Sequence, residues 1–495
     1  MQERYIASAD LGTSKIGLTV ARICGEDVQI IYHRETPSDG VRYSSVFNPK
    51  RASDALKVAV ETAQNELRIQ IRQLVVGLPR YAVRQEIASA KMMRTDPDSC
   101  ITDEEIAMLK SLALETYPLK DVAKEDIYGA VAQSFNTEDI FQGNEHDVVG
   151  ATSEFIEGNF KVFVGSRKAM SNVSVTLNQA GIAPAGIYFL PDAVASAVLT
   201  DEEKENGVAL IEIGAGVTSL SIYQGHIMRH YSAIPFGGRS ITTDIKYECG
   251  FKEVLAENIK LAFGACMPEK LQSMSEKIIQ INDEENGNFG QKLPVKYLSD
   301  IITCRATEII EAMLFLIQDS GYSEKLRSGI VLTGGGANLA NLTGLVREMS
   351  GYKVRIGFPR MRKLSAEGCD GITEAGAAAS VGMILTAKND PTINCTSEPL
   401  PAPEIVEEEE EVIEAESYDG TIFDQNTAVE KPAEQPYAKP KEPKKPKQPK
   451  QPKQRGPNPF NIIWGKMTGS AGNVLDGVLE VIGDLYDNTE GGNRK

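Results

Sequence analysis

Two stretches far apart in the chain repeat one pattern, and this repeat constrains the fold more than any other feature. Tyr5–Val20 (YIASADLGTSKIGLTV) and Val208–Tyr223 (VALIEIGAGVTSLSIY) both run from an apolar strand through an acidic residue and a glycine turn into a second strand. Asp10 in the first copy matches Glu212 in the second. One such hairpin arises often by chance, whereas a pair in the two halves of a chain predicts two similar domains that face each other across a cleft.

The two turns predict an anion site. Gly12–Ser14 and Gly214–Gly216 are small enough to let a ligand approach the backbone closely. Exposed backbone N–H groups in such turns bind anions, and the acidic residue before each turn is placed to hold a metal-bound water. The natural ligand is a nucleotide polyphosphate with Mg²⁺ between the turns.

A third glycine turn follows the buried strand Ile330–Thr333. Its sequence is GGGAN over residues 334–338, and a helix is expected over Leu339–Met349. A plain flexible turn is one interpretation. A strand, glycine turn and helix in this order favour a nucleotide contact instead, although the spacing matches neither a P-loop nor a Rossmann fingerprint.

Composition narrows the class of protein. The net charge of −17 argues against wholesale nucleic-acid binding. The seven cysteines are scattered and show no CxxC spacing, which predicts reduced thiols in a cytosolic protein. No apolar run reaches the roughly 20 residues that span a bilayer, so the chain is expected to be cytosolic unless something anchors it at a surface.

Local signals indicate how the first half is built. Asn48-Pro49 predicts the start of a helix that runs to about Ile69. Thr102–Glu105 reads as a capping box. Because the α/β rhythm breaks after Pro79 and resumes with a helix at Met170–Ala180, we expect a small α+β insertion between them. The alternative is that this region belongs to the first domain's sheet.

The C-terminal part changes character. Residues 397–457 carry an acidic run and then alternating Lys and Pro, which predicts a disordered linker. Apolar residues then return at helical spacing, at Phe460, Ile463, Trp464 and Met467. A membrane-lying helix, a helix packed on the protein and a partner-binding helix all fit this pattern. We favour the membrane, with the preceding lysines near an anionic surface.

These motifs together resemble the FtsA family of bacterial cell-division proteins, within the actin and heat-shock ATPase superfamily. The resemblance rests on DLGTSK, on ITDEEI and AQSF in the insertion, on the second hairpin, on IPFGGRSITTDIKYECG and on VLTGGGANLANL. It implies an α/β, actin-like two-domain ATPase fold with an inserted α+β subdomain, a disordered linker and a C-terminal amphipathic helix. The implied division is domain 1 at 1–80 and 166–203, the insertion at 81–165, domain 2 at 204–240 and 304–373, its outer subdomain at 241–303, a hinge and closing helix of domain 1 at 374–396, the linker at 397–457 and the tail helix at 458–487.

The resemblance also assigns site residues. It places Asp10 and Glu212 in the water shell of Mg²⁺. The residues expected to contact ATP are Asp10, Gly12, Thr13, Ser14, Lys15, Glu212, Gly214, Ala215, Gly216, Thr218, Glu257, Lys260, Gly334, Gly335 and Gly336. A surface salt bridge is an equally good interpretation of Glu257 and Lys260, which lie three residues apart on a helix. Asp192 is the acid nearest to the position of the hydrolytic base in related ATPases.

The implied function is a scaffold. It binds ATP, self-associates as actins do, and tethers the tubulin-like protein FtsZ to the cytoplasmic face of the cell membrane at the division site. The family docks the FtsZ C-terminal peptide on the outer subdomain, here with Arg305 nearby, and other division proteins on the insertion. Because Glu212 and Ala215 depart from the family's Asp-x-Gly-Gly-Gly turn, we expect slow or negligible hydrolysis. The rivals are a small-molecule kinase of the superfamily and a pilus-assembly actin homologue.

Overall fold

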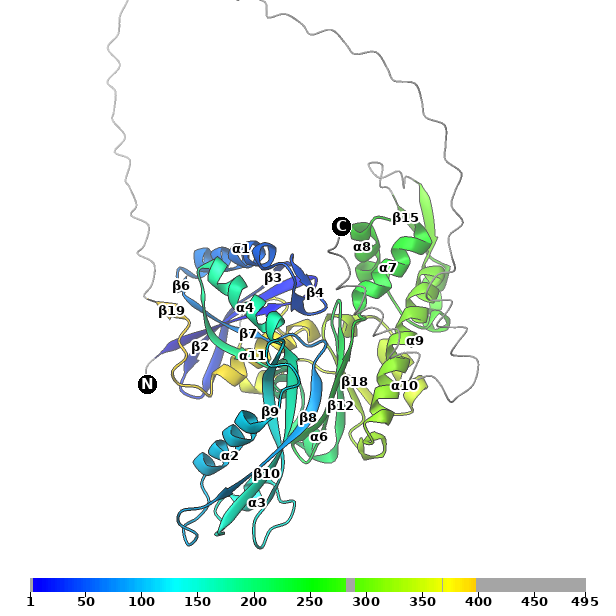
Figure 1. Cartoon of the computed structure of the whole chain (residues 1–495). Helices are drawn as coiled ribbons and strands as arrows, with labels where there is room; N and C mark the ends of the chain where they lie inside the picture. The colour runs from blue at the N-terminus through cyan, green and yellow to red at the C-terminus, as the bar shows by residue number, and fades with distance from the viewer. Residues whose placement is uncertain (1–2, 282–289, 367, 398–495) are drawn as a thin grey trace, which may run out of the picture. The chain divides into compact units, whose positions relative to one another are not determined.

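The computed structural model describes residues 3–281, 290–366 and 368–397 (Figure 1). The predicted linker and tail helix, including Phe460, Ile463, Trp464 and Met467, lie outside these residues. Among the described helices, none has both the length and the apolar character to cross a membrane. All seven cysteines are free thiols.

Domain 1 is built on a five-stranded sheet in the order β11-β7-β1-β2-β3. Its strands are β1 (Arg4–Leu11), β2 (Lys15–Cys24), β3 (Asp27–Pro37), β7 (Gln73–Gly77) and β11 (Ala183–Tyr188). The predicted first hairpin is confirmed, since β1 pairs antiparallel with β2 and Asp10 lies opposite Gly17. Strand β7 runs parallel to β1, so both strands end at the same edge of the sheet.

Helices cover both faces of this sheet (Figure 1). They are α1 (Pro49–Leu67) with α4 (Arg167–Ala180) on one side, and α5 (Leu190–Val198) with α11 (Ala378–Ala387) on the other. The expected start of α1 is confirmed, because the Asn48 side chain accepts a hydrogen bond from the Arg51 N–H and Pro49 occupies the first helical position. Short strand pairs lie at the margins, β4 (Val41–Arg42) with β5 (Ser45–Val46), and β6 (Gln70–Ile71) with β19 (Thr396–Ser397).

Domain 2 repeats this strand order, which reads from the opposite edge of its sheet as β14-β13-β12-β17-β18. Its strands are β12 (Val208–Ile213), β13 (Thr218–Gln224), β14 (Ile227–Ile234), β17 (Ile330–Thr333) and β18 (Val354–Ile356). Strands β12 and β13 correspond to β1 and β2. Its helices are α6 (Asp201–Asn206), α7 (Gly238–Cys249), α8 (Glu253–Phe263), α9 (Val295–Asp319) and α10 (Leu342–Ser350), with the short hairpin β15 (Ile278–Ile281) and β16 (Gln291–Pro294). The second hairpin is therefore also confirmed, with Glu212 opposite Ser219. Turns of 3₁₀ helix complete the chain as η1 (Pro268–Lys270), η2 (Gln272–Glu276), η4 (Ser323–Lys325), η5 (Gly335–Asn338), η6 (Met361–Lys363) and η7 (Ala375–Ala377).

The residues between the two parts of domain 1 form a sheet of their own. It consists of β8 (Arg84–Met93), β10 (Phe155–Ser166) and β9 (Glu125–Asn136) in that order, with α2 (Asp103–Thr116) and α3 (Glu145–Val148) beside it. A separate apolar core holds it together, with Phe135 and Phe160 packed edge to face. The expected capping box is present, because Thr102 and Glu105 bond each other's backbone N–H. This region is thus a small α+β unit rather than an extension of the first sheet.

One expected helix boundary was wrong. Helix α10 begins at Leu342, because η5 takes up the residues after the third glycine turn. The chain turns from β2 into β3 at Gly25, whose φ is positive. Residues 201–206 form the helix α6, capped by Thr200 and Glu203.

Candidate functional site

The structure brings the two glycine turns of the hairpins into contact. A side-chain carbon placed on Gly216 would lie 2.9 Å from Thr13 Oγ1, so only a glycine lets the two turns approach this closely. Thr13 Oγ1 also accepts a hydrogen bond from the Ser44 N–H at 3.2 Å. The turns that the sequence placed on either side of a ligand are therefore neighbours in the fold.

The second turn is held by the start of α7. The N–H groups of Gly238 and Arg239 donate to the carbonyls of Gly214 and Ala215, at 2.9 and 2.8 Å. Thr218, expected to contact phosphate, is buried and donates to the Phe236 carbonyl at 2.9 Å. Thr218 thus fixes the strand after the turn.

The third glycine turn reaches the same place, but its three glycines differ. Gly334 has φ +83° and, like Gly336, leaves no room for a side chain because Ile213 packs against it. Gly335 faces open space, where its nearest neighbour is Lys15 Nζ. Lys15 forms an ion pair with Glu35. Lys15 from the first turn and Gly335 from the third are thus adjacent, and Gly335 is the glycine of this turn that leaves room for a ligand.

Glu257 and Lys260 form the ion pair that was one of two interpretations. Lys260 Nζ lies 2.8 Å from Glu257 Oε2, and it also donates to the Gly238 carbonyl at 3.0 Å and to Thr242 Oγ1 at 2.9 Å. Its side chain is 11% exposed, against 40% for Glu257. The pair ties α8 to the start of α7, directly behind the second turn.

A residue that the motif analysis missed lies between the two acidic residues. Arg80 follows β7, and its Nη2 is 3.4 Å from Asp10 Oδ1 and 3.1 Å from Glu212 Oε1. The three side chains are only 10, 20 and 13% exposed. Since Asp10 belongs to domain 1 and Glu212 to domain 2, one guanidinium joins the two domains. We call this trio the Arg80 bridge.

The backbone of Arg80 is held on both sides. Its N–H donates to Ser44 Oγ at 3.4 Å, and its carbonyl accepts a hydrogen bond from the hydroxyl of Tyr231, a buried residue of β14. Burial raises the pKa of Glu212, and the positive charge of Arg80 opposes that rise. Burial alone would lower the pKa of Arg80, but the two carboxylates outweigh it and keep the pKa above its usual value.

This arrangement does not fit the predicted Mg²⁺ site. The two carboxylates expected to hold the metal's water shell already share a guanidinium. A divalent cation placed there would have to share the two carboxylates with the guanidinium, whose positive charge repels it. Across the described residues, no group of three or more His, Cys, Asp or Glu side chains could hold a metal ion. The magnesium assignment of Asp10 and Glu212 is therefore not supported by their geometry.

Asp192 is not brought to the turns. It lies in the first turn of α5, and its Oδ1 accepts a hydrogen bond from the Tyr223 hydroxyl at 2.9 Å. Tyr223 is paired with Val208 at the end of the hairpin away from the glycine turn, four residues along β13 from the partner of Glu212. Four residues of strand span about 13 Å. Asp192 is thus bonded to the far end of β13, which does not match the expected position of a hydrolytic base.

Arg305, expected near a partner, forms ion pairs within the protein. Its Nε and Nη2 contact the two carboxylate oxygens of Asp244 at 2.6 and 3.1 Å, and its Nη1 contacts Glu308. The side chain is 14% exposed. Its charge links α7 to α9.

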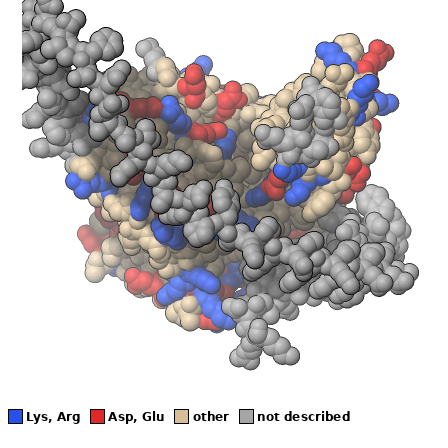
Figure 2. All heavy atoms as spheres, turned by 90° about the horizontal axis from the view of Figure 1, so that it is seen from above, with Lys and Arg blue, Asp and Glu red and all other residues tan. Residues whose placement is uncertain are grey.

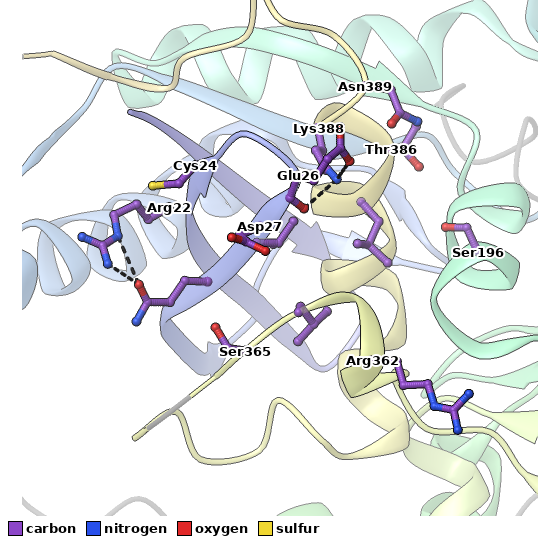
Figure 3. A pocket seen from close by; sticks show the side chains of 14 residues that line it. Arg22, Cys24, Glu26, Asp27, Ser196, Arg362, Ser365, Thr386, Lys388 and Asn389 are labelled. Carbon is purple, nitrogen blue, oxygen red and sulfur yellow. Dashed lines mark hydrogen bonds and ion pairs between the residues drawn. The ribbon is translucent and has the colours of Figure 1, made fainter. Parts of the chain in front are cut away.

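Two cavities adjoin the domain 1 sheet at opposite ends of β2. The larger, of about 880 Å³, lies at the end away from the glycine turn, is bounded by the β2–β3 hairpin and the end of α11, and is lined by none of the predicted site residues (Figure 3). Arg22 is bonded to Gln29 there, and Lys388 to Glu26. The other, of about 690 Å³, includes Lys15 and Glu35 in its wall. The face seen in Figure 2 carries Lys and Arg side chains beside Asp and Glu, without a broad area of one sign.

Known proteins support the same fold and family. The family model described as "Cell division protein FtsA" matches residues 209–382. Cell division protein FtsA of Neisseria meningitidis serogroup B is 28% identical over 363 residues, which cover 72% of this chain and 85% of that protein. Cell division protein FtsA of Borreliella burgdorferi is 29% identical over 365 residues, 72% of this chain and 86% of that protein.

A solved structure shows the fold alone. The PilM-PilN type IV pilus biogenesis complex superposes with a TM-score of 0.54 at 15% identity, covering 77% of this chain and 98% of the matched chain. The repeated strand order of the two sheets agrees with the actin-like architecture expected from the sequence. The resemblance predicted from the motifs is thereby confirmed: the chain is similar to cell-division proteins of the FtsA family, and its fold is actin-like.

Proposed function

We propose that the chain is an ATP-binding, actin-like division protein that tethers FtsZ to the cytoplasmic face of the cell membrane and self-associates. The observation that carries the nucleotide part is the meeting of three glycine turns from two domains, where Thr13 contacts Gly216 and Lys15 lies beside Gly335. Glycine turns that let a ligand approach the backbone, with a lysine beside them, are suited to a polyphosphate. The division role is supported by the relatives that the chain matches.

Slow or negligible hydrolysis is part of the proposal. Phosphoryl transfer needs a residue that orients the attacking water, and Asp192 is instead bonded to Tyr223. We expect ATP to bind while turnover stays far below the range of about 1–100 s⁻¹ typical of kinases. Measuring phosphate release by the full chain at saturating ATP checks this. Turnover within the kinase range would refute it.

The outer part of domain 2 supports an FtsZ docking surface. Tyr247 of α7 and Val254 and Leu261 of α8 are large apolar side chains that are exposed to solvent. Apolar side chains exposed on one pair of adjacent helices are typical of a peptide-binding face. The proposal therefore rests on these residues and not on Arg305, whose charge is already paired.

A charged substitution tests that surface. Leu261→Glu should weaken co-sedimentation with FtsZ filaments by about tenfold, because a central apolar contact contributes upwards of about 1.4 kcal/mol. Val122→Glu is the matched control, since Val122 is 63% exposed against 74% for Leu261 and belongs to the inserted subdomain. Equal binding by both variants would place the FtsZ site elsewhere, and a loss with Val122→Glu alone would place it on the insertion.

Membrane attachment rests on the sequence of the tail, which lies outside the described residues. Removing residues 460–495 should abolish co-sedimentation with anionic liposomes and leave FtsZ binding intact. Lys439–Arg455 stays in the truncated protein, so the comparison separates the apolar helix from the basic run. Liposome binding that survives the deletion would refute the anchor.

A small-molecule kinase remains the rival from another class, because its superfamily shares the fold. It would transfer phosphate from ATP to a small acceptor, and a screen of sugars and carboxylic acids discriminates the two. Since the likeness to the pilus complex shows only the fold, it does not favour pilus assembly over division.

A further inference from the structure

The Arg80 bridge is the feature of this molecule that the proposed function leaves unexplained. Asp10 and Glu212 stand at the ends of equivalent strands in the two domains, and an arginine from a third strand end lies between them. A buried arginine with two acidic partners fixes the positions of all three side chains, because guanidinium keeps its charge and binds oxygen in fixed directions.

The position of Arg80 follows from the sheet. Strand β7 runs parallel to β1, with Val76 beside Ala9, so the residues after Gly77 emerge next to Asp10 at the same edge. The backbone of Arg80 is then held by Ser44 on one side and Tyr231 on the other. The side chain is therefore anchored at the site and does not reach it from a distant loop.

One hydrogen-bond donor of the Arg80 guanidinium is unpaired among the described residues. Its Nη2 contacts both carboxylates and its Nη1 lies 3.4 Å from Ser44 Oγ. Among the residues that the structure describes, its buried Nε–H has no hydrogen-bond partner. A buried donor without a partner costs free energy, which a phosphate oxygen arriving at this place would recover.

We infer that Arg80 takes the place of a resident divalent cation, so that the chain binds ATP without Mg²⁺. The guanidinium neutralises the two carboxylates and supplies the positive charge next to the phosphates. This inference rests on the proposed nucleotide site. Beyond that site, the inference states that an arginine of the chain, and not a bound metal ion, supplies the positive charge.

Binding of ATP to the full chain, measured by calorimetry in Mg²⁺ and in EDTA, tests the inference. For the unaltered protein the dissociation constants in the two conditions should agree within about threefold. Arg80→Gln should weaken binding in EDTA by about 10- to 100-fold, the worth of one or two charge-assisted hydrogen bonds, and Mg²⁺ should restore much of the loss. Arg84→Gln is the control, because it removes the same charge four residues on, where the partners are Glu125 and Glu86.

Each other outcome is decisive. Binding by the unaltered protein that is lost in EDTA overturns the inference, and this result does not depend on how well any variant folds. Equal binding by Arg80→Gln and the unaltered protein in EDTA overturns the assignment to Arg80. No ATP binding in either condition rejects the nucleotide site as well, which distinguishes failure of the proposed function from failure of the cation inference.

A second measurement needs no nucleotide. Mn²⁺ added to the nucleotide-free protein and followed by electron paramagnetic resonance should remain free in solution with the unaltered chain. It should become bound in Arg80→Gln, where the two carboxylates have lost their counter-charge. Mn²⁺ held by the unaltered protein and released by Asp10→Asn would show that the metal and Arg80 coexist, contrary to the inference.

Discussion

Replacing Arg80 and Glu212 with glutamine, singly and together, measures how strongly the two domains are coupled through the Arg80 bridge. Arg80→Gln leaves two largely buried carboxylates without a counter-charge, and breaking such a buried pair costs about 3–5 kcal/mol. Glu212→Gln should cost less, about 1–2 kcal/mol, because Arg80 retains Asp10. Once Arg80 is gone, Glu212→Gln removes one uncompensated charge and should then be favourable. The double variant should therefore be more stable than the sum predicts, by at least about 2 kcal/mol.

Urea unfolding of the full chain, followed by far-UV circular dichroism, gives the four free energies of the cycle. The control cycle pairs Arg80→Gln with Glu308→Gln, whose partner Arg305 lies on α9. Those two changes should add within about 0.5 kcal/mol, as expected for sites without shared partners. If the free-energy changes caused by the Arg80 and Glu212 substitutions also add within about 0.5 kcal/mol, the two residues are not coupled and the bridge is refuted.

Two further predictions concern stability and closure. Burial, with Lys161 nearby, lowers the pKa of His230 to about 4, so the unfolded chain takes up a proton that the folded protein does not, and up to about 3 kcal/mol of stability should be lost as pH falls from 6.5 towards 4. His230→Gln should flatten that part of the stability profile, and an unchanged profile would assign the loss to other groups. Gly216→Val should weaken ATP binding by at least about tenfold, because the new side chain meets Thr13 and forces the turns apart. Calorimetry checks this, and unchanged affinity would show that the contact between the turns is not needed.

Local sequence signals predicted much of the fold because the interactions behind them are local. The twin hairpins follow from apolar runs that flank a glycine turn, and both form as expected. The start of α1 follows from Asn48 and Pro49, and the capping box of Thr102 from Glu105 three residues later. In each case the deciding contacts span only a few residues.

The contents of the site were harder to predict, because they depend on contacts between distant parts of the chain. Arg80 carries no motif, and only the parallel pairing of β7 with β1 brings it to Asp10 and thence to Glu212. Its place after a buried strand was the one available signal, as ligands bind at the carboxyl ends of parallel strands. Asp192 also depends on a distant contact, since its carboxylate accepts a hydrogen bond from Tyr223, 31 residues along the chain.

The glycines of the third turn show why a motif overstates its ligand contacts. All three looked alike in sequence, yet Gly334 and Gly336 are glycine because Ile213 packs against them. Only packing distances separate these two from Gly335, which faces open space. A run of glycines therefore identifies the place where a ligand can approach, but not which residue it touches.

Amide hydrogen exchange of the full chain, with and without saturating ATP, decides whether ATP binds where the turns of the two domains meet. We expect slower exchange over 12–15 and 214–218 together, with the amide of Gly335 slowed as well. Protection confined to the cavity at the β2–β3 hairpin, or no protection at either turn when ATP is bound, would contradict it.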